Sequence, residues 1–167
     1  MTAPSEITEH LQQADDAFEY IGLGTPAFEE GIDQDAEWKI QLTKACRYLE
    51  SARVLRAEDG FHGAVVELSF SSTERTIEAY LLWDTDDTIE NFHDHEAAYD
   101  RAAERGLFDR STASDLKGLY SDNRTGHYYG VQVPTKQKSD ATYALAESIH
   151  QYVTQQIRDG SVCICEK

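Results

Sequence analysis

Apolar residues recur at steps of three and four along most of the chain, which is the spacing of one face of an α-helix. The earliest such stripe consists of Ile7, Leu11, Ala14, Phe18 and Ile21. It predicts a short amphipathic helix near the N-terminus. The segment Gly22-Leu-Gly-Thr-Pro26 ends this helix, and the acidic stretch after it, up to Asp35, indicates a linker.

Two long helices are predicted next. The first spans residues 36–57 and ends at Gly60, with Leu42, Ala45, Cys46, Leu49, Ala52 and Leu55 on its inner face. The second begins near residue 61 and places Ala64, Val65, Leu68, Ser72, Arg75, Ala79 and Leu82 at helical steps. Because it has few charges before Glu74, we expect it to be the most buried helix.

Three further helices complete the pattern. Asp87 and Glu90 form a capping pair for a helix that runs to Arg105 and packs through Ile89, Phe92, Ala97 and Ala102. Ser111 or Ser114 caps the next, which ends near Gly126 and holds Leu116, Leu119, Tyr120 and Arg124. Thr135 caps the last, which ends near Gly160 with Ala141, Leu145, Ile149, Val153 and Ile157 inside.

No alternating strand pattern and no repeat is visible. The sequence therefore predicts an all-α protein, an antiparallel up-and-down bundle of four to five helices with an additional N-terminal helix. We expect an N-terminal helix and acidic linker over 1–35, the bundle over 36–160 and a tail over 161–167.

Charge narrows the possible partners. Asp and Glu number 31 against 15 Lys and Arg, a net charge of −16 spread along the chain. Such a coat is typical of proteins from salt-loving organisms, so we expect the source to be a halophilic archaeon. Disorder is the alternative, but 40% apolar residues in periodic runs oppose it. Because the coat repels polyanions, we expect no DNA partner and only a small, local RNA or nucleotide contact.

The remaining composition points to a cytoplasmic protein without membrane contact, since the first residues are polar and no apolar run is long enough to span a bilayer. Cys46 fits a helix core, and Cys163 with Cys165 lacks the second pair that a structural zinc site needs. His93 and His95 would diverge on a helix. We therefore predict no metal and no cofactor.

The candidate site lies where the fourth predicted bundle helix ends. Tyr120, Arg124 and His127 stand at i, i+4 and i+7, on one helical face, and Tyr128 and Tyr129 follow. Arginine offers a planar donor fork for phosphate and histidine titrates near neutrality, so the set suits a phosphodiester or nucleotide. The structural alternative is that the arginine caps carbonyls or pairs with a nearby acid such as Asp115 or Asp122.

The order of these signals resembles the HEPN superfamily, over about residues 44–157. The resemblance rests on the motif Ala45-Cys-Arg-Tyr-Leu49, the second helix with Ser72, Arg75 and Glu78-Ala79-Tyr-Leu-Leu82, then His93 and His95, Leu116-Lys-Gly-Leu-Tyr120, Arg124 and Tyr129-Gly130. The chain is most similar to the small bacterial and archaeal branch that is associated with minimal nucleotidyltransferases.

This resemblance implies a homodimer in which the arginine segments face one another. In active members an arginine and a histidine cleave RNA without a metal, so Arg124 and His127 are the candidate catalytic residues. Active members separate the two by four to six residues, whereas two separate them here. The Tyr-Gly ending is similar to that of the branch in which the histidine is often absent.

Two functions follow from the resemblance. One is a catalytically weak or silent module of a toxin–antitoxin-like system that binds a small nucleotidyltransferase or a nucleotide. The other is a metal-independent endoribonuclease toxin. Candidate binding residues are Arg75, Tyr120, Tyr128 and Tyr129. The resemblance also implies modification of a tyrosine by the partner enzyme, at Tyr128 or Tyr129, and Tyr129 is the candidate.

Overall fold

A computed structural model describes residues 4–20 and 24–157 of the chain, and every structural statement below concerns these residues. The chain divides into two compact units, Met1–Glu30 and Gly31–Lys167. The predicted 161–167 tail, including Cys163 and Cys165, lies outside the described residues.

The first unit contains the helix α1, Ser5–Phe18, which confirms the N-terminal helix. None of its residues is buried, and the apolar side chains of Leu11 and Phe18 are 60% and 89% exposed. The helix ends at Phe18, ahead of the Gly22 predicted to stop it, and Tyr20 follows with a φ of 58°. The apolar stripe therefore finds no cover within its own unit.

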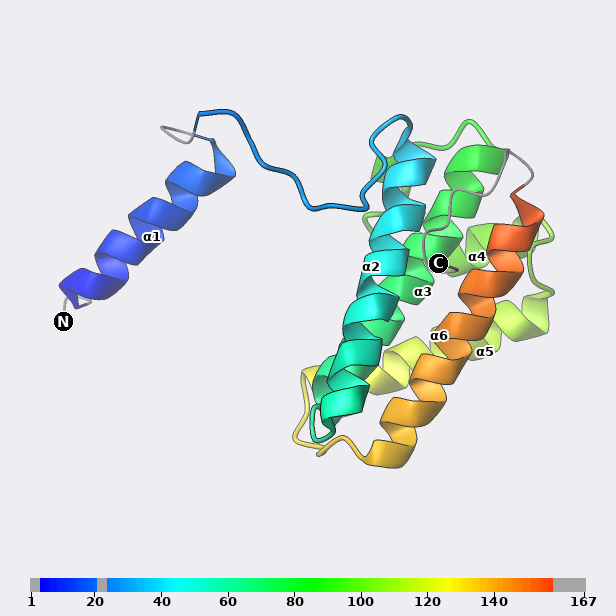
Figure 1. The fold of residues 1–167 in the computed structure, drawn as a ribbon. Coiled ribbons are helices and arrows are strands. Elements are labelled where there is room, and N and C mark those ends of the chain that lie inside the picture. The colour runs from blue at the N-terminus through cyan, green and yellow to red at the C-terminus, as the bar shows by residue number, and fades with distance from the viewer. Residues whose placement is uncertain (1–3, 21–23, 158–167) are drawn as a thin grey trace. The chain divides into compact units, whose positions relative to one another are not determined.

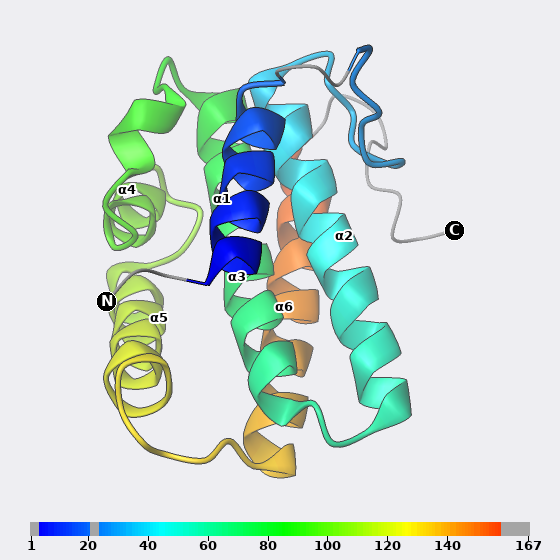
Figure 2. The ribbon, with the colours of Figure 1, turned by 90° about the vertical axis from the view of Figure 1, so that its left-hand side faces the viewer.

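The second unit is an all-helical bundle, as predicted. The helices α2 (Glu37–Glu58), α3 (His62–Asp84) and α6 (Lys136–Gln156) pack along one another (Figure 1). The shorter α4 (Ala97–Glu104) and α5 (Arg110–Asn123) lie on the other side of α3 (Figure 2). With neighbours on both sides, α3 has buried residues along most of its length, as the sequence predicted.

Apolar side chains from these helices form the core. The largest fully buried ones include Leu42, Leu49, Ile77, Leu81, Tyr99 and Val153. The predicted inner face of α2 is buried, except that Leu55 is only partly covered. In α6 the prediction for Ala141 was wrong, because Ser139 and Tyr143 take the inner positions there; Ala64 of α3 is likewise exposed.

The predicted third bundle helix is interrupted. A 3₁₀ turn, Ile89–Phe92, and α4 replace it, with bends and a turn at residues 93–96. The Asp94 carboxylate accepts a hydrogen bond from the Glu96 amide at 3.1 Å, a local turn that competes with a helix.

The caps of two helices also differ from the prediction. Thr88 and Asn91, rather than Asp87 and Glu90, form the capping box of the 3₁₀ turn. Asp109, rather than Ser111 or Ser114, caps α5 by accepting from the Thr112 amide at 2.7 Å. The helix begins at Arg110, earlier than predicted, so the Asp109 carboxylate stands directly before it.

The last helix begins as predicted, since the Thr135 hydroxyl accepts from the Lys138 amide at 3.2 Å. It ends at Gln156, and the predicted stop at Gly160 falls outside the described residues. Among the helices of residues 4–20 and 24–157, none is both long enough and apolar enough to cross a bilayer.

Candidate functional site

The backbone after α5 widens into a π-helical turn, Arg124–Tyr128. Its defining bond runs from the Tyr129 amide to the Arg124 carbonyl at 2.8 Å, five residues apart. Gly130 closes the turn, because a Cβ at this position would collide with the carbonyl oxygens of Thr125 and Gly126. The turn therefore requires glycine at Gly130, and π-turns occur frequently at functional sites.

The wide turn gathers three tyrosines around Arg124. Its guanidinium carbon lies 4.2 Å from the ring centroid of Tyr128, 5.0 Å from that of Tyr129 and 5.7 Å from that of Tyr120. One guanidinium nitrogen also donates to the Tyr129 hydroxyl at 3.1 Å. We call Arg124, Tyr120, Tyr128 and Tyr129 the aromatic cluster; Tyr128 and Tyr129 are exposed, and Tyr120 is buried.

Among the residues that the structure describes, Arg124 differs from most arginines in having no acidic partner. Those that pair with a carboxylate are Arg47, Arg53, Arg56, Arg75, Arg101 and Arg105. Over the described ranges, no carboxylate pairs with Arg124, and Asp115 and Asp122 do not serve as the predicted alternative partners. Its positive charge therefore remains available to an anion.

The structure brings Tyr120 to Arg124 but does not bring His127 to them. His127 Nδ1 donates to the Gln132 carbonyl at 3.2 Å, and its Nε2 accepts from the Lys138 ammonium at 2.7 Å. The physical reason is the π-turn: with more residues in each turn than an α-helix, the third residue after Arg124 no longer returns to its face. Tyr129, the fifth residue, returns instead.

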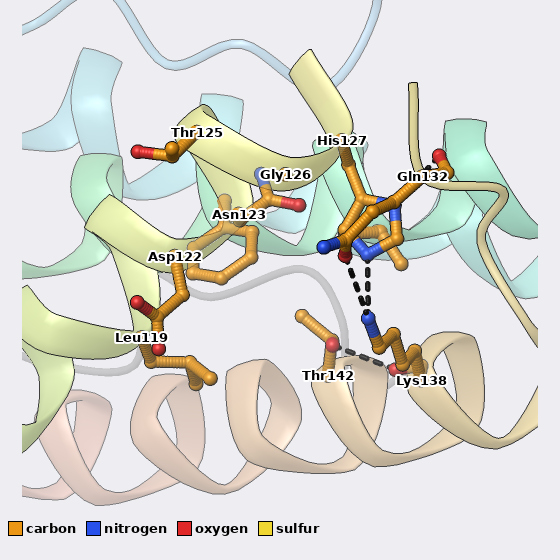
Figure 3. Close-up of a pocket in the computed structure, with 11 residues that line it drawn as sticks. Leu119, Asp122, Asn123, Thr125, Gly126, His127, Gln132, Lys138 and Thr142 are labelled. Carbon is orange, nitrogen blue, oxygen red and sulfur yellow. Dashed lines mark hydrogen bonds between the residues drawn. The ribbon is translucent and has the colours of Figure 1, made fainter. Parts of the chain in front are cut away.

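His127 lines a separate groove between the end of α5 and α6 (Figure 3). The groove has a volume of about 540 Å³ and an apolar side formed by Val66, Phe70 and Leu119. Lys138 lies below His127 and Gln132 and donates to both. Both ring nitrogens of His127 are thus engaged, which leaves neither free for proton transfer in this arrangement.

A second histidine, His95, adjoins the aromatic cluster. Its Nδ1 lies 3.0 Å from a carboxylate oxygen of Glu74, and its ring centroid lies 5.8 Å from that of Tyr120. The interrupted helix makes this possible, since His95 lies in the turn before α4 rather than on a helical face. No signal in the sequence pairs His95 with Glu74, because tertiary packing joins them.

Arg75, a candidate binding residue, is instead held by acids of its own helix. Its guanidinium lies 2.9 Å from Glu78 and 3.4 Å from Glu74, both buried. The Gln41 amide also donates to Glu78 at 2.7 Å. The prediction that Arg75 faces a ligand is therefore not supported by its position: its charge is neutralised between two carboxylates, as burial requires.

Burial raises the pKa values of Glu78 and Tyr120. Desolvation raises the pKa of Glu78 from 4.5 to about 7, although the charge of Arg75 opposes this rise. Burial also raises the pKa of Tyr120, with a further rise from Glu74 and a lowering influence from Arg124. Glu74 and Arg124 therefore both act on the Tyr120 hydroxyl, which makes no hydrogen bond within the described part of the chain.

The remaining cysteine and histidine side chains are the other groups that could bind a metal. Cys46 is buried, and its sulfur lies 3.2 Å from His150 Nε2, whose Nδ1 in turn lies 2.8 Å from the Thr76 hydroxyl. Among the described residues, no group of three or more His, Cys, Asp or Glu side chains is positioned to hold a metal ion.

Comparison with known proteins gives one result. No curated protein and no solved structure matches the chain. A family model described as "Domain of unknown function (DUF8154)" matches residues 2–165, nearly the whole sequence. The chain therefore belongs to the DUF8154 family.

Proposed function

We propose that this protein is a HEPN-like helical homodimer that binds a phosphate-bearing ligand through Arg124. Its physiological role would be that of a partner-binding module in a toxin–antitoxin-like system, with a small nucleotidyltransferase or a nucleotide as the bound species. The observation that carries the proposal is the charge of Arg124, which tyrosines surround and no described carboxylate neutralises.

The chemistry of the aromatic cluster suits a nucleotide. A guanidinium binds phosphate oxygens through paired donors, and exposed Tyr128 and Tyr129 offer faces on which a base can stack. Stacking of one base on an aromatic side chain contributes about 1–3 kcal/mol. A net charge of −16 would repel a long polyanion, so a ligand with few phosphates is favoured.

A two-fold dimer would strengthen the site. If the two aromatic clusters face one another, two uncompensated guanidinium groups share one cleft and raise the local positive potential within the acidic coat. The same coat, together with the even spread of acids, supports a halophilic archaeon as the source.

The second candidate function is a metal-independent endoribonuclease that uses Arg124 and His127. The unpaired Arg124 favours it, because cleavage requires charge stabilisation at the phosphate. The hydrogen bonds that occupy both nitrogens of His127 argue against it. Binding is therefore the function that we favour for this pair of residues.

Binding can be tested by calorimetry in molar KCl with AMP and with a single-stranded tetraribonucleotide. Replacing Arg124 by Ala should weaken the binding of both at least about 10-fold, because a charge-assisted hydrogen bond is lost. Arg110→Ala is the matched control, since Arg110 lies on α5 and likewise has no carboxylate partner among the described residues.

Two results would contradict the proposal. One is a wild-type protein that binds neither probe, and the other is an Arg124→Ala variant that binds as tightly as wild type. The partner is tested separately, by purifying the tagged chain from its native host and identifying whether a small nucleotidyltransferase accompanies it.

A further inference from the structure

The groove between the end of α5 and α6 is a second site, and no residue of the aromatic cluster lines it. We propose that it binds a small monocarboxylic acid, with the apolar body of the ligand against Phe70 and Leu119 and its carboxylate on Lys138. The inference goes beyond the proposed function, because it uses neither Arg124 nor a phosphate. Each of the two can therefore fail without the other.

The size and lining of the groove suit a small ligand with an apolar body. Its volume of about 540 Å³ lies within the range of about 300–1,000 Å³ that small-molecule sites occupy. Val66 and Phe70 line it from α3, where both are buried, and Leu119 lines it from α5 with 43% of its surface exposed. A ligand that covers Leu119 removes apolar surface from water, which favours binding.

The segment that leaves the π-turn builds the polar end of the groove. The Gln132 amide donates to the Gly126 carbonyl at 3.1 Å, which folds this segment back toward the turn. A Cβ at Gly126 would lie 2.7 Å from Gln132 Oε1, so glycine lets the glutamine side chain lie against the turn. Lys138 donates to that oxygen at 3.5 Å and to His127 Nε2 at 2.7 Å. The ammonium group is therefore held at one end of the groove (Figure 3).

The charge of Lys138 is not neutralised by an acid of the described chain. Three other lysines pair with aspartates: Lys39, Lys117 and Lys136. Lys138 instead donates to an imidazole nitrogen and an amide oxygen, and no carboxylate of residues 4–20 and 24–157 forms an ion pair with it. Because an ammonium group has three donors, one remains for a ligand. In a chain of net charge −16, an unpaired cation in a groove favours an anion there.

A single positive charge favours a carboxylate over a phosphate. A lysine ammonium is a point charge that balances one negative charge, whereas a phosphate monoester carries about −1.5 to −2 near pH 7. Asp122 lines the groove at the end away from Lys138, near Leu119 (Figure 3). A second anionic group at that end would be repelled. The ligand is therefore a monocarboxylate whose other end is apolar.

Calorimetry with the full chain in molar KCl tests this inference, with octanoate as the probe and 1-octanol and octanedioate for comparison. Octanoate should bind at least about 10-fold more tightly than 1-octanol, which has the same chain length without the charge. Octanedioate should bind more weakly than octanoate, because its second carboxylate lies near Asp122. Asp122→Asn should narrow that difference by about 3-fold, the size expected for one exposed pair of charges.

Two further variants separate the charge from the apolar contact. Lys138→Met keeps the aliphatic stem and removes the charge, so it should weaken octanoate binding at least about 10-fold and leave 1-octanol binding unchanged. Lys44→Met is the matched control, since Lys44 is exposed on α2, has no carboxylate partner among the described residues and does not line the groove. Leu119→Asn should weaken octanoate and 1-octanol alike by about 5-fold, because apolar contact is lost. Val54→Asn, at another exposed apolar position, should bind both as wild type does.

The inference is overturned by a wild-type protein that binds no octanoate, by equal affinities for octanoate and 1-octanol, or by full octanoate affinity in Lys138→Met. Arg124→Ala should bind octanoate as wild type does while its affinity for AMP falls, so the two sites are tested independently. Loss of octanoate binding in Arg124→Ala would place the ligand at the aromatic cluster and also overturn the inference. Circular dichroism and melting curves for each variant establish that a loss of affinity is not a loss of fold.

Discussion

Arg75 and Arg124 lie in two regions of the bundle that surround the same charged side chain with different partners. Arg75 points between Glu74 and Glu78, both buried, so its charge is cancelled inside the protein. Arg124 lies among tyrosine rings at the helix exit, and in the described part of the chain it meets no carboxylate. Aromatic faces attract a cation without consuming its hydrogen-bond donors, so Arg124 can still bind an anion.

The largest expected effect is a difference between the two arginines in how much each contributes to the free energy of unfolding. Arg75→Ala should lower the free energy of unfolding by about 3–5 kcal/mol at pH 8, because two buried carboxylates lose their cation. Arg124→Ala should cost only about 1–2 kcal/mol, the value of its contacts with the rings. Urea unfolding of both variants measures the difference; equal losses would mean that Arg124 is as structural as Arg75.

The second prediction concerns Glu78 and pH. Its pKa is raised to about 7 in the folded protein from 4.5, so the folded state holds the proton more tightly than the unfolded state. Its contribution to stability is complete below about pH 4.5 and is lost as the pH rises through about 7, by up to about 3 kcal/mol.

Glu78→Gln should remove this pH dependence, because the amide does not titrate. Urea unfolding at pH 5 and pH 8 measures it for the wild type and the variant. If the difference in stability between the two proteins is the same at both pH values, Glu78 does not titrate in this window.

The third prediction perturbs the Arg124 region and leaves the Arg75 region untouched. Gly130→Ala places a methyl group against the carbonyl oxygens of Thr125 and Gly126 and should cost about 1–3 kcal/mol. It should also weaken nucleotide binding, since the π-turn that brings Tyr129 to Arg124 must shift.

Gly118→Ala is the control for this substitution. Gly118 lies within α5 and a Cβ there meets nothing within 4 Å, so alanine should stabilise the helix by up to about 1 kcal/mol. Melting temperatures that fall for both variants would show that the close approach at Gly130 is not the cause.

The sequence predicted the helices more successfully than the site. Apolar spacing is a property of the chain itself, so the all-α bundle, its most buried helix and the Thr135 cap could be found. The break before α4 depends on one side-chain bond, from the Glu96 amide to Asp94, that spacing does not reveal. The HEPN resemblance, the dimer and the partner stay predictions.

The candidate site was predicted only in part, because spacing along one helix can be found in the sequence and contacts between distant segments cannot. Arg124 and Tyr120 are neighbours on one helix, and their contact follows from helical spacing. The π-turn that separates His127 from them adds one residue to a turn, which only the folded backbone displays. The contact of His95 with Glu74 joins α3 to the turn before α4, and only packing brings these segments together.

The wide turn after α5 also has a consequence for local opening. The Tyr129 amide donates a hydrogen bond to the Arg124 carbonyl where the turn ends, and most of the surrounding side chains are in contact with solvent. Such a segment unfolds on its own at a lower free energy than the bundle, so its amide protons exchange with deuterium early. A ligand that binds Arg124, Tyr128 and Tyr129 together would slow the exchange of these amide protons, whereas the protection of the α3 amides would stay constant.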